Sequence, residues 1–481
     1  MLVDFILREG TVIDGSGRER FKADVAIDGD RVLRVGDCTG LEARQDIDVR
    51  GLVVAPGFID THSHDDAEVL TRPDMVAKVS QGVTTVVVGN CGISAGPSVD
   101  IGMGHEIMQG HRFASFGDYV ELLRAQPSNV NVAPLIGHTS LRGAVMRNLA
   151  QPASPQEVEA MRALLQDALQ AGAIGVSTGT AYPPARAATT REIVDICEPL
   201  ARHGGIFTTH MRDEAAGLLG SIDETGEIGS ALGVRTLISH HKCLGVANHG
   251  MSIRSLEAVD RWRQRMPLAI DVYPYAATST VLLPERVRAS SRTQITVCPS
   301  HPDLIGRDVA EVAEEWGCTI EEFCSRVGVG GATYFALSEE DVTRTLAHPA
   351  SMIGSDGVPA QERPHPRLWG TFPRVLGHYS RELGLFGLEA AVRKMTGLPA
   401  DFFRMAERGR LEPGYFADVT VFSPDEVVDT ATFDEPTRMA RGIEYVFLNG
   451  QPTWRRGKIV AARPGRVLGC RPVTPRDDRI A

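Results

Sequence analysis

The middle of the chain alternates apolar, β-rich segments with amphipathic helical patterns, and this alternation restricts the fold more than any other feature. Eight such segments stand at residues 57–64, 84–91, 130–138, 173–179, 205–212, 235–242, 267–275 and 351–357. Each precedes a helical pattern or a long excursion, which is typical of a TIM (β/α)8 barrel of the α/β class. Their continuous apolar character is what strands covered on both faces require.

The helical patterns carry recognisable start and stop signals. In SPQEVEAMRALLQDALQAG, Ser154 and Glu157 have the spacing of a capping box, and Gly172 stands where a C-cap glycine is expected. The sequence therefore predicts a helix between the third and fourth strands of the barrel.

The two ends of the chain have a different pattern. Residues 1–56 and 412–481 read as short strands, with hairpin turns at Asp14-Gly15, Asp28-Gly29 and Asn449-Gly450. We expect both ends to pair into one small β-sandwich-like domain beside a barrel at 57–411. Between the seventh and eighth strands, residues 283–349 exceed an ordinary connection, so we expect an inserted lid over the catalytic face.

Composition excludes several classes of partner. The 481 residues carry a formal net charge of -11, which argues against a nucleic-acid surface or an anionic membrane as principal partner. The N-terminus lacks a signal-peptide pattern, and no apolar run is long enough for a transmembrane helix, so we expect a cytoplasmic protein. The eight cysteines lack CxxC pairs and are expected to be mostly free thiols. Oligomeric state is not indicated.

Metal-binding side chains stand at the ends of the predicted strands. In FIDTHSHDD, His62 and His64 are two residues apart and therefore point the same way from a strand. The other candidate ligands end strands 2, 5, 6 and 8, and they are Cys91, His210, His240 and Asp356. Thiolate, imidazole and carboxylate converging on one rim indicate zinc. His241 faces away by strand parity.

Several motifs carry a resemblance to a known family. FIDTHSH, the histidines of strands 5 and 6 and the aspartate of strand 8 resemble the amidohydrolase superfamily. Within it, VVGNCGIS, GVSTGTAYPP, THMRDE, SHHK, DVYPYAATST, IGSDGVP and PHPRLWGTFPRVLG resemble the D-aminoacylases, which are N-acyl-D-amino-acid deacylases. The resemblance covers nearly the whole chain, and it alone implies D over L stereochemistry.

The fourth strand, AIGVSTG, lacks the lysine that bridges two metals in many amidohydrolases, so a thiolate bridge from Cys91 is expected instead. The resemblance implies a tight zinc site and a weaker second site. The tight site consists of Cys91, His210 and His240, and the weaker site of His62, His64, Cys91 and Asp356. Zinc lowers the pKa of bound water and polarises the amide carbonyl, while Asp356 takes the proton and passes it to the leaving amine.

An N-acyl amino acid presents a carboxylate, so the rim needs fixed cations. The resemblance places Lys242, Tyr273 and Arg367 at this group, and Tyr182 and Ser279 are weaker pocket candidates. After strand 7, VLLPERVRASSR concentrates arginines, of which Arg286 and Arg288 are candidates for a second carboxylate. This favours N-acyl-D-glutamate as the substrate, with hydrophobic N-acyl-D-amino acids as the alternative.

Other interpretations stay open. A cyclic amide hydrolase of the dihydropyrimidinase type is disfavoured by the missing strand-4 lysine, and an inactive scaffold is disfavoured by the intact ligand set. His138 and Arg142 in GHTSLRG either assist catalysis or tie loops together.

Overall fold

A computed structural model describes residues 1–101 and 110–469 of the chain. Strands from both ends form a single nine-stranded sheet, in which β5 pairs antiparallel with β18. Its strands are β1 (Leu2–Val12), β2 (Phe21–Asp28), β3 (Arg31–Gly36), β4 (Glu42–Asp48), β5 (Val53–Pro56), β18 (Val419–Phe422), β19 (Ile443–Leu448), β20 (Gln451–Arg455) and β21 (Lys458–Ile459). The predicted hairpins are confirmed, since β1 and β2, β2 and β3, and β19 and β20 pair antiparallel.

The middle of the chain is an α/β unit built on parallel strands. These are β6 (Phe58–Asp60), β7 (Val83–Val88), β8 (Asn131–Pro134), β9 (Ile136–Gly137), β10 (Gly175–Gly179), β11 (Ile206–His210), β12 (Thr236–Ile238), β13 (Leu268–Val272) and β17 (Ser351–Ile353). Hydrogen bonding runs in the order β6-β7-β8 and β9-β10-β11-β12-β13-β17. Thr61 N also donates to Ile353 O, which links the end of β6 to β17. Every residue of these strands is buried, as strands covered on both faces must be.

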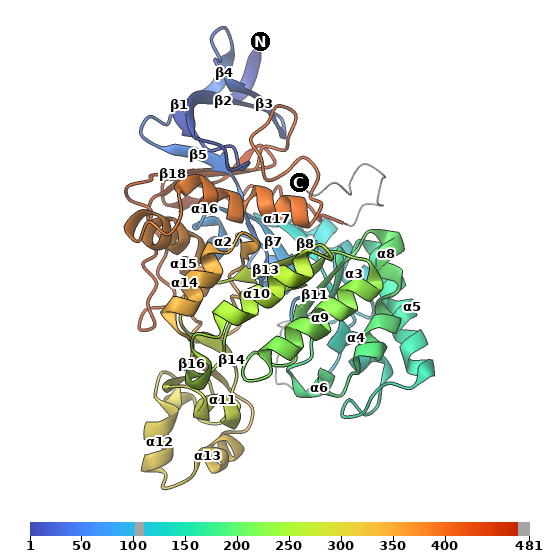
Figure 1. Cartoon of the computed structure of the whole chain (residues 1–481). Helices are drawn as coiled ribbons and strands as arrows, with labels where there is room; N and C mark the ends of the chain where they lie inside the picture. The colour runs from blue at the N-terminus through green and yellow to red at the C-terminus, as the bar shows by residue number, and fades with distance from the viewer. Residues whose placement is uncertain (102–109, 470–481) are drawn as a thin grey trace.

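Helices lie outside the parallel strands (Figure 1). They are α1 (Glu68–Thr71), α2 (Val76–Val79), α3 (Phe116–Ala125), α4 (His138–Val145), α5 (Pro155–Ala171), α6 (Pro183–Arg186), α7 (Thr190–Cys197), α8 (Pro199–His203), α9 (Leu218–Leu232), α10 (Ser252–Arg263), α14 (Glu339–Ala347), α15 (Arg367–Arg374), η3 (Val375–Glu382), α16 (Leu388–Met395) and α17 (Gly397–Phe402). The capping box predicted for α5 is present, with Gly172 as its C-cap.

An inserted unit separates β13 from β17. It consists of β14 (Thr278–Val281), α11 (Pro284–Arg288), β15 (Arg292–Val297), η2 (Pro302–Leu304), α12 (Val309–Glu315), α13 (Ile320–Val327) and β16 (Gly331–Phe335). Its strands form an antiparallel sheet in the order β14-β16-β15. In Figure 1 the unit projects from the end of the molecule opposite the N-terminal strands.

The inserted unit differs in extent from the predicted segment 283–349. It begins earlier, at β14, and α14 lies outside it because that helix packs against α10, β13 and β17. The sequence of α14 shows an N-cap and an apolar stripe, but these features do not reveal which body the stripe packs against.

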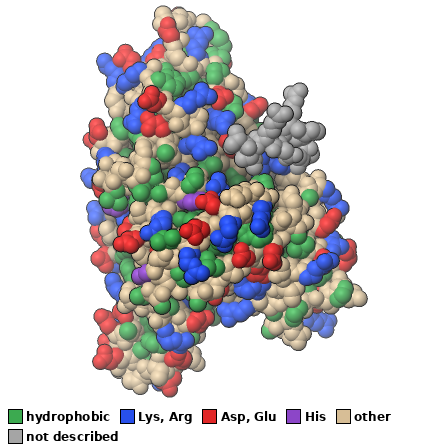
Figure 2. Space-filling view, viewed as in Figure 1, with side chains coloured by type: hydrophobic (Ala, Val, Ile, Leu, Met, Phe, Trp, Pro, Cys, Tyr) green, Lys and Arg blue, Asp and Glu red, His purple; other side chains and the backbone are tan. Residues whose placement is uncertain are grey.

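The seven cysteines among the described residues have free thiols, as predicted, and Cys470 lies outside those residues. Acidic and basic side chains are interspersed over the face shown in Figure 2. Across residues 1–101 and 110–469, no helix combines the length and apolar character needed to cross a membrane.

Candidate metal centre and substrate pocket

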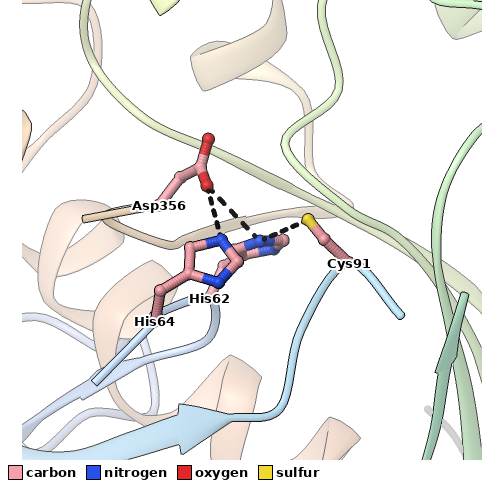
Figure 3. Close-up of side chains that lie close together, drawn as sticks. All are labelled: His62, His64, Cys91 and Asp356. Atoms are coloured by element: carbon pink, nitrogen blue, oxygen red, sulfur yellow. Dashed lines mark hydrogen bonds and ion pairs between the residues drawn. The ribbon is translucent and has the colours of Figure 1, made fainter. Parts of the chain in front are cut away.

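The histidine pair of the FIDTHSHDD motif follows directly after β6. The Asp60 carboxylate accepts a hydrogen bond from the backbone N–H of His62, at 3.2 Å. Two backbone hydrogen bonds join this turn to the residues after β17, since Asp356 N donates to His62 O and His64 N donates to Gly357 O. The Nε2 atoms of His64 and His62 therefore lie 3.2 and 3.6 Å from Asp356 Oδ1 (Figure 3).

Cys91 occupies the centre of the cluster. It follows β7 and is only 5% exposed. Cys91 and Gly92 both adopt left-handed backbone, with φ of 54° and 81°, so the chain turns sharply at this point. The Sγ atom of Cys91 lies 3.4 Å from His62 Nε2, 3.6 Å from His210 Nδ1 and 3.3 Å from His240 Nε2.

Two groups of potential metal ligands share this thiol. One consists of Cys91, His210 and His240, and the other of His62, His64, Cys91 and Asp356. Within each group the donor atoms lie within 4.8 Å of one another. Sulfur and nitrogen donors dominate the first group, and the second adds a carboxylate, so both donor sets fit zinc.

Burial keeps the imidazoles neutral, which is the form that binds a metal. It lowers the pKa of His62 and of His210 to about 3, and it also lowers the pKa of His240. Burial raises the pKa of the Cys91 thiol well above its ordinary value. A divalent cation at the shared position would favour the thiolate instead.

Three of these side chains stand on strained backbone. Cys91, His240 and Asp356 have φ of 54°, 36° and 49°. A left-handed conformation in a residue other than glycine costs on the order of 1–3 kcal/mol, and such strain is concentrated at functional sites. The fold therefore holds these three side chains against a local energetic preference.

Asp356 and Arg367 form a buried ion pair. Arg367 Nη1 lies 2.8 Å from Asp356 Oδ2, and Arg367 Nη2 donates to Ser279 O. Burial disfavours the charge of Asp356, but Arg367 and the neighbouring histidines hold the pKa of its carboxyl well below the ordinary value. The Arg367 guanidinium also lies 4.6 Å from the ring centre of Tyr273. The structure thus brings Arg367 and Tyr273 together beside Asp356.

Lys242 contacts His240 and also Glu214, a buried carboxylate that was not predicted from the sequence. Its Nζ donates to Glu214 Oε1, at 2.5 Å. Glu214 belongs to the THMRDE motif, four residues after His210, and is 3% exposed. The i, i+4 spacing to a candidate ligand was the available signal, but the contacts with His240 and Lys242 arise only in the tertiary structure.

An open cavity of about 70 Å³ lies over the cluster. Its lining includes Lys242, Tyr182, Ser279 and Arg286, beside apolar side chains of Ala67, Ile93, Val358, Pro359 and Ala360. Tyr182 Oη lies 2.9 Å from Thr280 Oγ1, and the Ser279 hydroxyl donates to Gln361 Oε1 at 3.3 Å. Among the described residues, Arg286 forms no direct ion pair with a carboxylate, although the charge of Glu214 raises its pKa.

Arg288 is not brought to this cavity. It is exposed at the end of α11, and its guanidinium pairs with Glu321 of α13. The two arginines diverge because positions two apart on a helix do not share a face. Of the two arginines predicted to reach the pocket, Arg286 therefore lines this cavity and Arg288 does not.

Three other polar side chains have structural partners. His241 turns away from the cluster, with Nε2 2.9 Å from Ser255 Oγ. Arg142 donates to the backbone oxygens of Pro184, Leu149 and Gln151 and pairs with Glu192. Because Arg142 is fully buried, it ties these loops together, and His138 Nε2 lies 3.6 Å from the same glutamate.

Comparison with known proteins agrees with this geometry. The model of the amidohydrolase family matches residues 45–228 and 250–454. D-aminoacylase from Alcaligenes xylosoxydans xylosoxydans is 50% identical over 97% of both chains. From the same organism, N-acyl-D-aspartate deacylase is 46% identical over 97% of this chain and 95% of its own, and N-acyl-D-glutamate deacylase is 44% identical over 97% and 96%.

Solved structures show the same fold. A D-aminoacylase described with a binuclear metal centre has 49% identity and a TM-score of 0.95, covering 97% of this chain and 100% of its own. N-acyl-D-glutamate deacylase from Bordetella bronchiseptica, complexed with zinc and a phosphonate mimic of the tetrahedral intermediate, has 43% identity and a TM-score of 0.94, covering 98% and 100%. The chain therefore belongs to the amidohydrolase family, in the branch that contains D-aminoacylase and the N-acyl-D-amino-acid deacylases.

Proposed function

We propose that the protein hydrolyses the amide bond of N-acyl-D-amino acids with the help of zinc, releasing a carboxylate and a free D-amino acid. The observation that carries this proposal is the convergence of Cys91, four histidines and Asp356 beneath an open cavity. The names of the full-length relatives support the substrate class and its D configuration.

We also propose that Cys91, His210 and His240 hold one zinc tightly, and that His62, His64, Cys91 and Asp356 form a weaker second site. Support comes from the first group's burial, since His64 in the second group is partly exposed. A zinc complex of one relative and a binuclear centre in another are in keeping with this assignment.

The architecture around the site belongs to the same proposal. A TIM (β/α)8 barrel is supported by the parallel strand order and by the hydrogen bonds from the turn after β6 to β17. A small β-sandwich-like domain is supported by the nine-stranded sheet, in which β1–β5 and β18–β21 combine. In a TIM barrel the candidate ligands stand at the C-terminal rim, where active sites occur.

The mechanism assigns proton transfer to Asp356. Zinc, when bound, lowers the pKa of water to about 7 and polarises the amide carbonyl. Asp356 accepts the proton of the attacking water and then donates it to the departing amine, so one carboxyl serves as base and acid. Arg367 orients that carboxylate through Oδ2, which leaves Oδ1 directed at His62 and His64.

For the α-carboxylate of the substrate we propose Lys242, Tyr273 and Arg367. Both cations lie near the Tyr273 ring, at 5.8 and 4.6 Å from its centre. The Tyr273 hydroxyl is buried without a hydrogen-bond partner among the described residues, so it has a donor to offer an incoming anion.

For the substrate side chain we propose D-glutamate, because Arg286 lines the cavity without a direct carboxylate partner among the described residues. A second carboxylate on the substrate would form a direct ion pair with this guanidinium. The alternative is a substrate with a hydrophobic side chain, which is favoured by apolar lining residues such as Ile93 and Val358. Tyr182 and Ser279 complete the wall.

The test is kinetic. N-acetyl-D-glutamate, N-acetyl-D-leucine and their L enantiomers are compared by release of free amino acid, in the native protein and in Arg286→Ala and Arg288→Ala. The proposal expects N-acetyl-D-glutamate to turn over best and Arg286→Ala to remove that preference. Better turnover of the leucine compound refutes the side-chain assignment, and a loss confined to Arg288→Ala would transfer the role to that arginine. Hydrolysis of dihydrouracil instead of linear amides would favour the dihydropyrimidinase alternative.

A further inference from the structure

His210 and His240 turn opposite nitrogens towards Cys91, and their remaining nitrogens meet the same carboxylate. His210 faces the thiol with Nδ1 and His240 with Nε2. On the far side, His210 Nε2 lies 3.2 Å from Glu214 Oε2, and His240 Nδ1 lies 3.0 Å from Glu214 Oε1. One side chain thus stands behind both candidate zinc ligands.

We propose that Glu214 is the positioning residue of the metal site, which fixes the ring orientation and the tautomer of His210 and His240 together. This inference rests on the proposed zinc site. A neutral imidazole has a single N–H, so a carboxylate that accepts it at one nitrogen leaves the lone pair at the other. One oxygen of Glu214 lies beside each ring, so in the proposed arrangement the lone pairs of the two rings point to the side of Cys91.

Lys242 makes this carboxylate necessary. Its Nζ lies 2.7 Å from His240 Nδ1 and 2.5 Å from Glu214 Oε1. An ammonium group that donated to His240 Nδ1 would move the ring proton to Nε2, which is the nitrogen that faces Cys91. Glu214 Oε1 accepts from Lys242 and also lies 3.0 Å from His240 Nδ1, so in the proposed arrangement it competes with the ring for the ammonium group and keeps the ring proton on Nδ1. The carboxylate therefore protects one ligand from the nearby cation as well as orienting it.

The fold places Glu214 with little freedom. Its backbone oxygen accepts a hydrogen bond from Leu244 N at 2.7 Å, which joins the loop after β11 to the loop after β12. The preceding Asp213 binds the backbone N–H groups of Ala215 and Gly217 and so closes the turn. Glu214 is 3% exposed, and its carboxylate is therefore shielded from water.

The first experiment compares Glu214→Gln with Glu224→Gln. The amide offers one acceptor and one donor, so it cannot accept an N–H from both rings. We expect zinc affinity, measured by competition with a chromogenic chelator, to fall roughly 10–100-fold in Glu214→Gln. Glu224 pairs with Arg212 and bonds Thr190, so the same chemical change there leaves zinc affinity at the wild-type level.

A second pair of variants separates orientation from charge balance. Lys242→Met alone is expected to leave zinc affinity within about threefold of wild type, since the Glu214 contacts to both rings persist. When Lys242→Met is combined with Glu214→Gln, we expect it to restore only the part of the lost zinc affinity that results from His240. Full recovery in the double variant would reduce Glu214 to a counter-ion of Lys242 and overturn the proposal.

The ring nitrogens give a readout independent of activity. In zinc-loaded protein labelled with ¹⁵N-histidine, the proton is expected on His210 Nε2 and His240 Nδ1, and cobalt-substituted Glu214→Gln is expected to show a changed visible spectrum. Unchanged zinc affinity in a folded Glu214→Gln variant overturns the inference. If that variant does not fold, the tautomers measured in the wild-type protein provide the test. Absence of the protons from His210 Nε2 and His240 Nδ1 would then overturn the inference. Wild-type protein that binds no zinc contradicts the proposed function instead.

Discussion

Arg367 and His64 contact different oxygens of Asp356, so each oxygen of this carboxylate has its own partner. Arg367 Nη1 lies 2.8 Å from Oδ2, and His64 Nε2 lies 3.2 Å from Oδ1. A carboxylate held at both oxygens keeps one orientation, which is what a group that must receive and return a proton requires.

Replacing Asp356 by Asn is expected to reduce kcat by roughly 10²–10⁴-fold, because the amide cannot accept the proton of the attacking water. The first ligand group does not contain Asp356, so its metal is expected to remain. Steady-state kinetics together with metal analysis of the purified variant check both parts. Equal losses of metal and turnover would mean that Asp356 acts mainly as a ligand.

Replacing Arg367 by Lys is expected to lower kcat/KM for N-acyl-D-amino acids by roughly 10–100-fold, since a planar two-donor contact with a carboxylate is lost. An N-acyl amine that lacks the α-carboxylate serves as the comparison substrate. If Arg367 binds that group, the variant discriminates less between the two substrates than the wild type. A uniform loss on both substrates would assign Arg367 to Asp356 alone.

Replacing Cys91 by Ala is expected to lower the metal content at both ligand groups, because they share this thiol. Treatment of the native protein with a chelator is expected to abolish turnover, and added zinc to restore it. Cys197→Ala is the matched control, since that thiol is fully buried on α7 and belongs to neither group. Full zinc occupancy in Cys91→Ala would contradict the shared-ligand arrangement.

The Glu192 carboxyl predicts a pH dependence of stability. Burial opposes its charge, but His138, Ala153 N and Arg142 lower its pKa from 4.5 to about 2. A lowered carboxyl pKa stabilises the fold above pH 4.5, and this contribution is lost as the pH falls towards 2. The difference corresponds to about 3 kcal/mol. In urea unfolding, Glu192→Gln is expected to be less stable than wild type at pH 7, with the gap closing between pH 4.5 and 2. A stability difference between the two proteins that stays constant with pH would show that the contact of Arg142 with residue 192 does not depend on the charge of Glu192.

Sequence patterns predicted the α/β class and indicated side chains that the structure brings together, because both depend on local features. A residue at the end of an apolar strand, such as His210 or Cys91, is visible in the sequence, and parallel strands bring such ends together. The hairpin turn at Asn449-Gly450 is equally local, since both residues adopt positive φ.

The features that the sequence could not supply depend on distant contacts. In the sequence Glu214 resembles any acidic loop residue. Only the tertiary structure shows that β11 and β12 place His210 and His240 beside its two oxygens. Arg286 and Arg288 lie on different faces of α11, but the pairing of Arg288 with Glu321 is visible only in the tertiary structure. The extent of the inserted unit is set in a similar way, because α14 packs against β13 and β17. A cytoplasmic location stays a prediction.

The pairing of β5 with β18 has a consequence for the order of synthesis. β5 runs through Gly57 straight into β6, the strand that presents His62 and His64. Because β18 is made more than 350 residues later, β5 leaves the ribosome with one edge unsatisfied. The first histidine pair should therefore acquire its final anchorage only near the completion of translation, and nascent chains arrested before β18 should be more readily cleaved by protease around Gly57 than released ones.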